Sequence, residues 1–144
     1  MKNNLKLFLD DIRMPEDAWI YSERIKMLEK SNTISCEWDI VRNYEDFCEF
    51  INKFGIPSVV SFDHDLSEDF MKHYFDHTVH TGIIEYDKLK TKCGLHCAEY
   101  LFNYCVRENI KFPEYFIHSA NRWGSSNIKK CIEDFIKKYP HLQS

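Results

Sequence analysis

The stretch Ser58–Leu66, S-V-V-S-F-D-H-D-L, decides the fold that the sequence predicts. Its first part, Ser58–Phe62, is rich in β-branched and aromatic residues, as buried strands are. Pro57 stands before this run and the polar triplet Asp63–Asp65 stops it, so both ends of the predicted strand are defined. In parallel α/β sheets, ligands bind outside the carboxyl ends of the strands, where this triplet would lie. The stretch therefore predicts a buried strand that delivers acidic side chains to a site.

Three more short apolar runs predict further strands of the same sheet. They are Leu5–Leu9, Glu37–Val41 and Tyr115–Ile117. The first run stops at a pair of aspartates, and the last leads into a histidine and a serine. Polar groups that follow several strands at once are typical of a shared site at one edge of a sheet.

Helical segments are predicted between these strands from their hydrophobic periodicity. They cover about residues 17–30, 44–54, 94–108 and 126–138. Asn43 is the predicted N-cap of the second helix, and Gly55 is predicted to end it in the left-handed conformation. We expect Pro15 to prevent a helix directly after the first strand. We also expect Gly124 to lie in a loop before the last helix.

Strands that alternate with helices predict one α/β domain, residues 1–144, with a parallel sheet of about four strands covered on both faces. Residues 67–92 do not fit this alternation and are interpreted as an insertion that carries a short helix or a hairpin. Within it, His73, His77 and His80 would share one face of a helix. A zinc site there is an open alternative.

Composition limits the function classes. The net charge is −4 and no stretch is strongly basic, so strong binding to duplex nucleic acid is not expected. The spacing of Cys93, Cys97 and Cys105 predicts thiols on a buried helix face rather than disulfides. No apolar run has transmembrane length and no signal peptide is visible, so we expect a cytoplasmic protein without a membrane partner.

Four carboxylates carry the chemistry: Asp10, Asp11, Asp63 and Asp65. Like charges about 4 Å apart repel by several kcal/mol near a protein surface, so they need a divalent cation or a shared proton between them. Hard oxygen donors suit Mg²⁺ or Mn²⁺. The neighbouring His64 could instead attract a softer ion. The alternative is that each acidic group forms an ordinary turn or cap after its strand.

Other polar residues near the predicted strand ends suit a phosphate ligand. Arg13 and Arg42 could each hold a phosphate through two hydrogen bonds, although either could form only a surface ion pair. His118 could act as a general acid or base, or could be a structural histidine. Ser119 and Asn121 could donate to a phosphoryl oxygen.

Four motifs resemble a known family. They are L-F-L-D-D-I-R at Leu7–Arg13, V-R at Val41-Arg42, S-F-D-H-D-L at Ser61–Leu66, and H-S-A-N-x-x-G-x-x-N-I at His118–Ile128. Together they resemble the cyclic-phosphate-processing receiver-like family of bacteria and bacteriophages. That family is similar to the receiver domains of response regulators, which implies a flavodoxin-like three-layer sandwich.

The resemblance also implies roles for individual residues. Asp10 and Asp11 match the acidic pair of receivers that binds Mg²⁺, and Asp63 matches their phospho-accepting aspartate. Ser119 matches their small hydroxyl residue. The sequence departs from true receivers because it offers no fifth strand with their invariant lysine. It departs from the family at Arg122, where proline is common.

These observations favour a metal-dependent phosphoesterase that processes a small cyclic nucleotide or the cyclic phosphate of an RNA end. In this hypothesis Asp10, Asp11 and Asp63 are metal ligands. Asp65 or His64 assists as ligand or base, while His118 protonates the leaving oxygen. The remaining predicted substrate-binding residues are Arg13, Arg42, Ser119 and Asn121.

Two alternatives remain open from the sequence. The first is a receiver-like switch or binding module that takes up phosphate on Asp63 without turnover. The second is an accessory protein that acts through contact with another protein, with a surface on the aromatic residues of the insertion. Those residues are Phe70, Tyr74, Phe75 and Tyr86.

Overall fold

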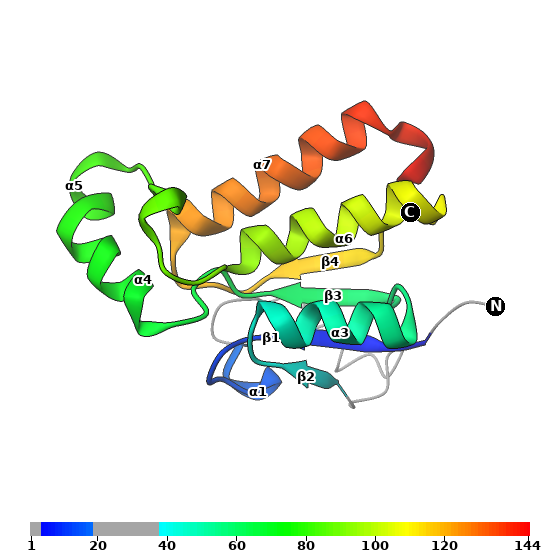
Figure 1. The fold of residues 1–144 in the computed structure, drawn as a ribbon, viewed down its shortest axis with the longest axis horizontal. Helices are drawn as coiled ribbons and strands as arrows, with labels where there is room; N and C mark the ends of the chain where they lie inside the picture. Colours follow the sequence, from blue (N-terminus) through cyan, green and yellow to red (C-terminus); the bar gives the residue numbers. More distant parts are fainter. Residues whose placement is uncertain (1–3, 19–37) are drawn as a thin grey trace.

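Four parallel strands form the centre of the protein. The computed structural model describes residues 4–18 and 38–144 (Figure 1). The strands are β1 (Lys6–Leu9), β2 (Asp39–Val41), β3 (Val59–Phe62) and β4 (Glu114–Ile117), in the order β2-β1-β3-β4. The predicted parallel sheet is confirmed. Because β1 and β3 are central neighbours on either side of the switch in strand order, their carboxyl ends frame the expected ligand position.

Three long helices form a layer against this sheet. They are α3 (Tyr44–Phe54), α6 (Gly94–Glu108) and α7 (Arg122–Lys138), with α6 in contact with both others (Figure 1). Their buried side chains meet the strands in one apolar core. Cys93, Cys97 and Cys105 are buried, as predicted. The arrangement is a receiver-like, flavodoxin-like α/β fold.

The helix boundaries differ from the predictions at three places. The sequence predicted that Pro15 would prevent an early helix and that the helix would begin at about residue 17. Instead, Pro15 is the first residue of α1 (Pro15–Ala18), where its missing N–H costs no hydrogen bond, so this prediction was wrong. The rest of the helix expected at 17–30 lies outside the described residues. Gly55 has a φ of +80° and donates its N–H to Ile51, but its ψ of −166° is extended, so the cap is not left-handed helical. Asn43 caps α3 as predicted.

The last helix starts four residues earlier than expected, at Arg122. The side chain of Asn121 accepts a hydrogen bond of 2.9 Å from the backbone N–H of Gly124 and so caps the helix. Gly124 therefore lies in the first turn of α7 rather than in a loop. The helix ends at Lys138, and the short 3₁₀ turn η3 (Pro140–Leu142) follows it.

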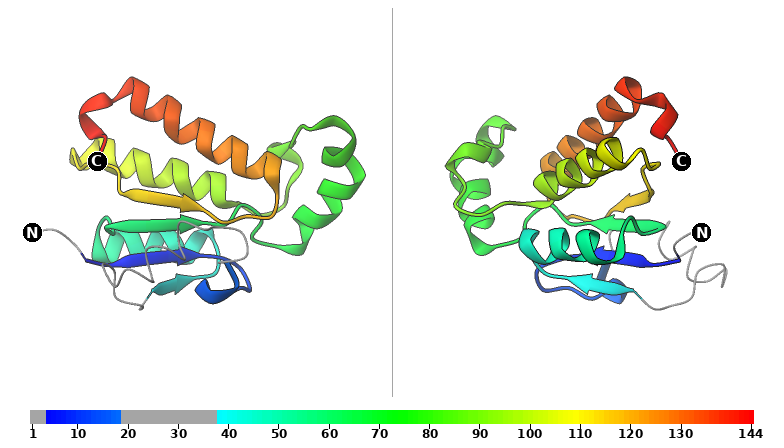
Figure 2. Two further views of the ribbon diagram at one scale, coloured as in Figure 1. Left: turned by 180° about the vertical axis from the view of Figure 1, so that it is seen from behind. Right: turned by 45° about the vertical axis from the view of Figure 1, so that its right-hand side comes forward.

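The insertion forms a helical arm, not a hairpin. It contains α4 (Glu68–His73), the π-helical segment η1 (Tyr74–Thr78), α5 (Val79–Thr81) and the 3₁₀ turn η2 (Tyr86–Lys88). Figures 1 and 2 show α4 and α5 standing off from the sheet and the long helices. The predicted aromatic surface is partly wrong, because Phe70 is 2% exposed while Phe75 is 61% exposed.

The histidines of the arm do not form a metal-binding group among the described residues. The Nε2 atom of His73 accepts the backbone N–H of Glu85, and His77 lies 3.7 Å from the Glu85 carboxylate. His80 is exposed. The two histidines that face inward thus hold the chain that returns from the arm, and the zinc alternative is not supported.

Candidate metal and phosphate site

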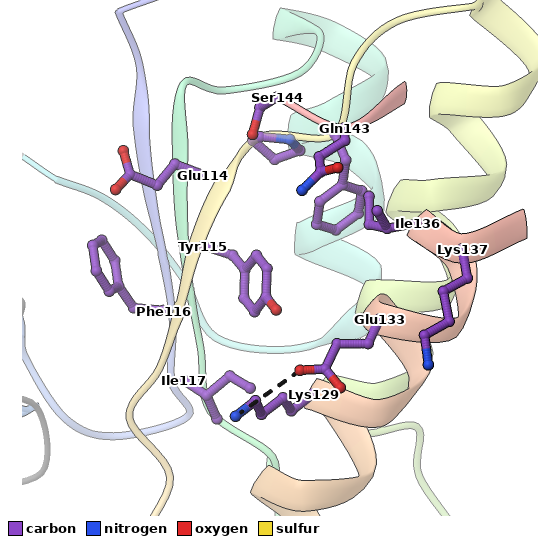
Figure 3. Close-up of a pocket in the computed structure, with 12 residues that line it drawn as sticks. Glu114, Tyr115, Phe116, Ile117, Lys129, Glu133, Ile136, Lys137, Gln143 and Ser144 are labelled. Atoms are coloured by element: carbon purple, nitrogen blue, oxygen red, sulfur yellow. Dashed lines mark ion pairs between the residues drawn. The ribbon is translucent and has the colours of Figure 1, made fainter. Parts of the chain in front are cut away.

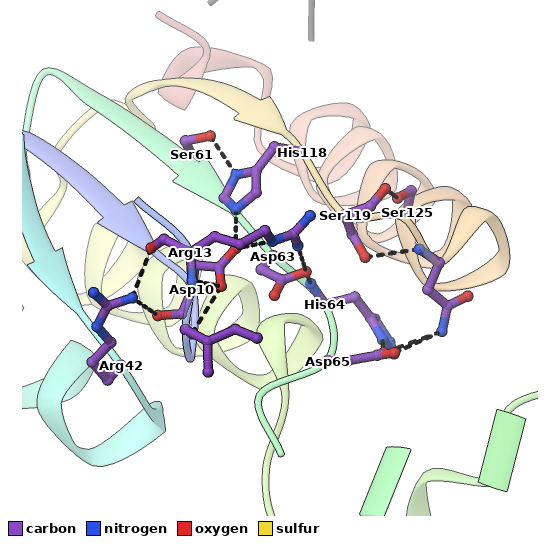
Figure 4. Close-up of polar contacts among 12 residues, drawn as sticks. Asp10, Arg13, Arg42, Ser61, Asp63, His64, Asp65, His118, Ser119 and Ser125 are labelled. Carbon is purple, nitrogen blue, oxygen red and sulfur yellow. Dashed lines mark hydrogen bonds and ion pairs between the residues drawn. The ribbon is translucent and has the colours of Figure 1, made fainter. Parts of the chain in front are cut away.

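The carboxyl ends of β1 and β3 bring two aspartates together. Leu9 pairs with Phe62 in the sheet, so Asp10 and Asp63 follow at neighbouring positions. The backbone N–H of Asp63 donates to the carbonyl of Leu9 at 3.0 Å. Both carboxyl groups are buried, and Figure 4 shows them facing one another across the ends of the strands.

Asp10 is held by donors on both carboxylate oxygens. Its Oδ1 accepts the backbone N–H groups of Ile12 and Arg13, and its Oδ2 lies 2.7 Å from Arg13 Nε and 3.0 Å from His118 Nε2. Burial alone would raise the pKa of Asp10. The hydrogen bonds from His118 and the loop outweigh it and hold this pKa well below its usual range. Asp10 is therefore ionised.

His118 is fully buried and bonded at both ring nitrogens. Its Nδ1 lies 2.7 Å from Ser61 Oγ, and its ring stacks on Phe8 at 4.4 Å. Burial lowers the pKa of His118, so the neutral ring donates Nε2–H to the ionised Asp10 and accepts the hydroxyl proton of Ser61 at Nδ1. This geometry favours the alternative of a structural histidine, with Asp10 as the group that it positions.

Asp63 is the carboxyl group with the least compensation. Burial, together with the charge of Asp10, raises its pKa to about 7, although Arg13 opposes this rise. Its Oδ1 accepts the backbone N–H of His64 at 2.8 Å and lies 3.1 Å from an Arg13 nitrogen. A carboxyl group so placed is protonated in part at neutral pH, which is one of the two ways that the sequence suggested for relieving the repulsion.

Arg13 provides a third way, which the sequence analysis missed. Its guanidinium bridges Asp10 and Asp63, and 21% of its side chain remains exposed. Arg42 also behaves differently from expectation. Its guanidinium donates to the backbone carbonyls of Asp10 and Arg13, at 3.1 and 2.7 Å, and so holds the loop after β1 in place.

One group of side chains in the described part of the chain could hold a metal ion. Asp10, Asp63 and His118 offer two oxygens and one nitrogen within 4.8 Å of one another. Asp11 is outside this group. Burial is the main cause that raises the pKa of Asp11, and the charge of the neighbouring Asp10 raises it further. The side chains of Asp10 and Asp63 converge with only the Arg13 guanidinium bridging them among the described residues, and their oxygen donors suit a divalent cation, so these residues fit a metal ion.

A second network contains the remaining predicted polar residues. His64 is fully buried, with Nδ1 bonded to Asp65 and Nε2 lying 2.9 Å from the hydroxyl of Tyr86. The same hydroxyl accepts an N–H of Asn127, so its own proton goes to His64 and the ring keeps Nδ1–H for Asp65. Asn121 donates to Asp65 at 3.1 Å. The result is an oriented, partly exposed carboxylate at Asp65.

Two glycines fix the loop that joins these networks. A Cβ atom on Gly94 would lie 1.8 Å from the carbonyl oxygen of Asp63, and one on Gly124 would lie 2.3 Å from the ring of His64. The Gly94 N–H also donates to the His64 carbonyl. The loop therefore passes between the first turns of α6 and α7, and no larger residue fits at either glycine without displacement.

Ser119 stabilises the turn that leads from β4 into α7. Its Oγ accepts the N–H of Asn121 at 3.1 Å, while its carbonyl accepts the hydroxyl of Ser125. Of the predicted site residues, the structure thus brings most into two adjoining clusters. Sequence reasoning missed the site contacts of Ser61, Tyr86 and Asn127. Ser61 is a polar residue on the otherwise apolar strand β3, but Tyr86 and Asn127 lie in polar segments that give no such signal.

A groove lies elsewhere, between β4 and α7 (Figure 3). It has a volume of about 620 Å³ and is lined by Glu114–Ile117 together with residues of α7 such as Lys129 and Glu133. None of the predicted site residues lines it. The convergence of titratable groups, rather than this groove, therefore locates the candidate site.

A parallel sheet with an acidic site at the carboxyl ends of its central strands defines a receiver-like α/β domain. Residues 5–134 match the family described as the cyclic-phosphate processing receiver domain, and the chain belongs to that family. No curated protein and no solved structure matched the chain. Among the described helices, none is long and apolar enough to cross a bilayer.

Proposed function

We propose that this domain is a metal-dependent phosphoesterase that acts on the cyclic phosphate of a small nucleotide or an RNA end. The observation that carries the proposal is the buried group Asp10, Asp63 and His118, whose ligand atoms lie within 4.8 Å of one another beside an arginine. Support also comes from membership of a family associated with cyclic-phosphate processing.

Asp10 and Asp63 would hold the ion, with His118 as nitrogen ligand and Asp11 next to them. Mg²⁺ or Mn²⁺ suits the carboxylates, and a bound ion of this kind polarises a phosphoryl oxygen and lowers the pKa of a water ligand. If His118 binds through Nε2, its proton moves to Nδ1 and faces Ser61, whose hydroxyl can accept as well as donate.

The side chains around this group would bind and orient the substrate. Arg13 is partly exposed and carries a planar fork of donors, so it would contact a phosphate at the same time as the carboxylates. Asp65 is the best placed general base, because His64 and Asn121 orient its carboxylate while part of it stays open to solvent. In this proposal His64 acts through Asp65, whereas His118 contacts the ion directly.

The test is hydrolysis of 2′,3′-cyclic nucleotides and of RNA that ends in a cyclic phosphate. Asp63→Asn and Asp65→Asn should each lower the rate at least about hundredfold, and chelation followed by Mn²⁺ should remove and restore it. The matched control is Asp134→Asn, which neutralises a carboxylate on the solvent face of α7. Hydrolysis that survives both Asp63→Asn and chelation would exclude this mechanism.

A second function is favoured by one contact. Arg13 places a positive charge 3.1 Å from Asp63, the position that matches a receiver's phospho-acceptor. We therefore keep a phosphate-binding switch as the alternative proposal. Incubation with a small phosphodonor and intact-mass measurement separates the two. A stable adduct that Asp63→Asn abolishes favours the switch, whereas turnover of a cyclic substrate without an adduct favours the enzyme.

A further inference from the structure

The arm carries an apolar stripe that faces solvent. Met71, Phe75, Val79 and Ile83 are 65%, 61%, 44% and 60% exposed. Met71, Phe75 and Val79 lie within the helical segments and recur every four residues, whereas Ile83 follows Gly82, which ends the helix. This spacing exceeds the roughly 3.6 residues of an α-helical turn, so such a row would drift around an α-helix. The wider turn of the π-helical segment Tyr74–Thr78 opposes this drift and keeps the row on one face.

A charged row runs directly beside this stripe. Glu68, Lys72, Asp76 and His80 are all exposed and follow the same spacing. Read along the helix, the row alternates between an acidic and a basic residue. Reversing its direction therefore places each acidic residue opposite a basic one. A helix with this property is complementary to a second copy of itself in the antiparallel orientation.

We propose that the arm is a dimerisation element that pairs with the arm of a second copy of this chain about a two-fold axis. Phe75 lies near the axis, and Met71 packs against Val79 of the second copy. Lys72 pairs with Asp76 of the second copy, and Glu68 pairs with His80 of the second copy. Because the arm stands off from the rest of the domain, its outer face can meet another arm (Figures 1 and 2).

Sedimentation of the purified protein over a range of concentrations tests this inference. The wild type should form a dimer that dissociates on dilution, and Phe75→Glu should sediment as a monomer at every concentration. The control Val106→Glu changes an exposed apolar residue of α6 in the same way and should leave the dimer intact. A wild type that stays monomeric up to millimolar concentration, or a Phe75→Glu protein that dimerises normally, would overturn the proposal.

A charge exchange keeps the test independent of folding. Lys72→Glu alone and Asp76→Lys alone should each raise the dimer dissociation constant about tenfold or more, because each places like charges opposite one another twice. Mixing the two variants should restore association, since the mixed dimer again pairs opposite charges. An effect of either substitution on its own helix cannot be reversed by mixing the two variants. If mixing does not restore association, the antiparallel arrangement is contradicted.

Discussion

The guanidinium of Arg13 lies 3.1 Å from the carboxylate of Asp63 and 2.7 Å from that of Asp10. One arginine from the loop after β1 thus joins the carboxyl ends of β1 and β3. A cation built into the chain offsets part of the negative charge that a metal ion would otherwise have to offset alone. Because of this contact, the pKa of Asp63 depends on the charge of Arg13.

Replacing Arg13 by glutamine should raise the pKa of Asp63 above its value of about 7. Burial and Asp10 already raise this pKa, and Arg13 is the nearby positive charge that opposes them. The expected rise is about one unit or more. It can be followed by carboxyl-carbon NMR in the presence of chelator. An unchanged titration of Asp63 would mean that the bridge is absent in solution, and Lys130→Gln is the matched control on the exposed face of α7.

The raised pKa of Asp63 predicts how stability depends on pH. The folded state holds this proton up to about pH 7, whereas the ordinary pKa of a free aspartic acid side chain is 3.8. The folded state therefore binds more protons than the unfolded state between these values, so this contribution falls as pH rises from about 4 to 7. Asp10, with its lowered pKa, loses its contribution only at much lower pH.

Urea unfolding of wild type and Asp63→Asn in chelator, between pH 5 and 8, measures this effect. Removing the carboxyl group should make the free energy of unfolding of the variant fall less steeply with pH than that of the wild type. The difference should be on the order of a few kcal/mol at most, because each pKa unit corresponds to about 1.4 kcal/mol. Parallel curves for the two proteins would contradict the raised pKa.

Gly94→Ala should destabilise the domain by roughly 2–4 kcal/mol, since the added methyl group meets the backbone carbonyl of Asp63 and cannot be accommodated by a side-chain movement. Gly55→Ala is the comparison, because no atom lies within 4 Å of a Cβ there and only the positive φ is unfavourable. Its cost should be nearer 1 kcal/mol. Thermal and urea unfolding would show the difference, and equal losses would count against the close approach at Gly94.

Tyr86→Phe should lower catalytic turnover while leaving the Michaelis constant nearly unchanged. The phenol ring would stay in place, but His64 would lose the hydroxyl at Nε2 and its hold on Asp65 would weaken. Steady-state kinetics on a 2′,3′-cyclic nucleotide would measure the effect, with Tyr104→Phe, at a half-buried tyrosine of α6, as control. A Tyr86→Phe enzyme with normal turnover would remove the tyrosine and histidine from the proposed mechanism.

Local patterns predicted the sheet and the acidic ends of its strands. Leu5–Leu9 and Ser58–Phe62 are apolar runs that stop at aspartates, and parallel strands place such stops at one edge. Helix ends were less predictable, because Gly124 reads as a loop residue until the side chain of Asn121 is seen to cap it. The predicted N-cap at Asn43 was found because its whole signal lies within four residues.

Contacts between distant segments could not be predicted from one sequence. The hydroxyl of Tyr86 meets His64 across 22 residues because the insertion folds back on the sheet, which no local pattern encodes. The guanidinium of Arg13 could have pointed to solvent, and only the burial of Asp10 and Asp63 makes the inward position favourable. Residue types alone thus predicted the chemistry of the site, but they did not predict which side chains would contact one another.

The two glycines that enclose the Asp63–Asp65 loop have a consequence for how such domains can diversify. The Asp63–Asp65 loop packs directly against the first turns of α6 and α7. A change in this loop would therefore disturb the packing of both helices. New ligand preferences are therefore expected to arise at the rim, from the loop after β1 and from the arm. Chains with arms of very different length could then share the same loop and the same helix starts beneath the site.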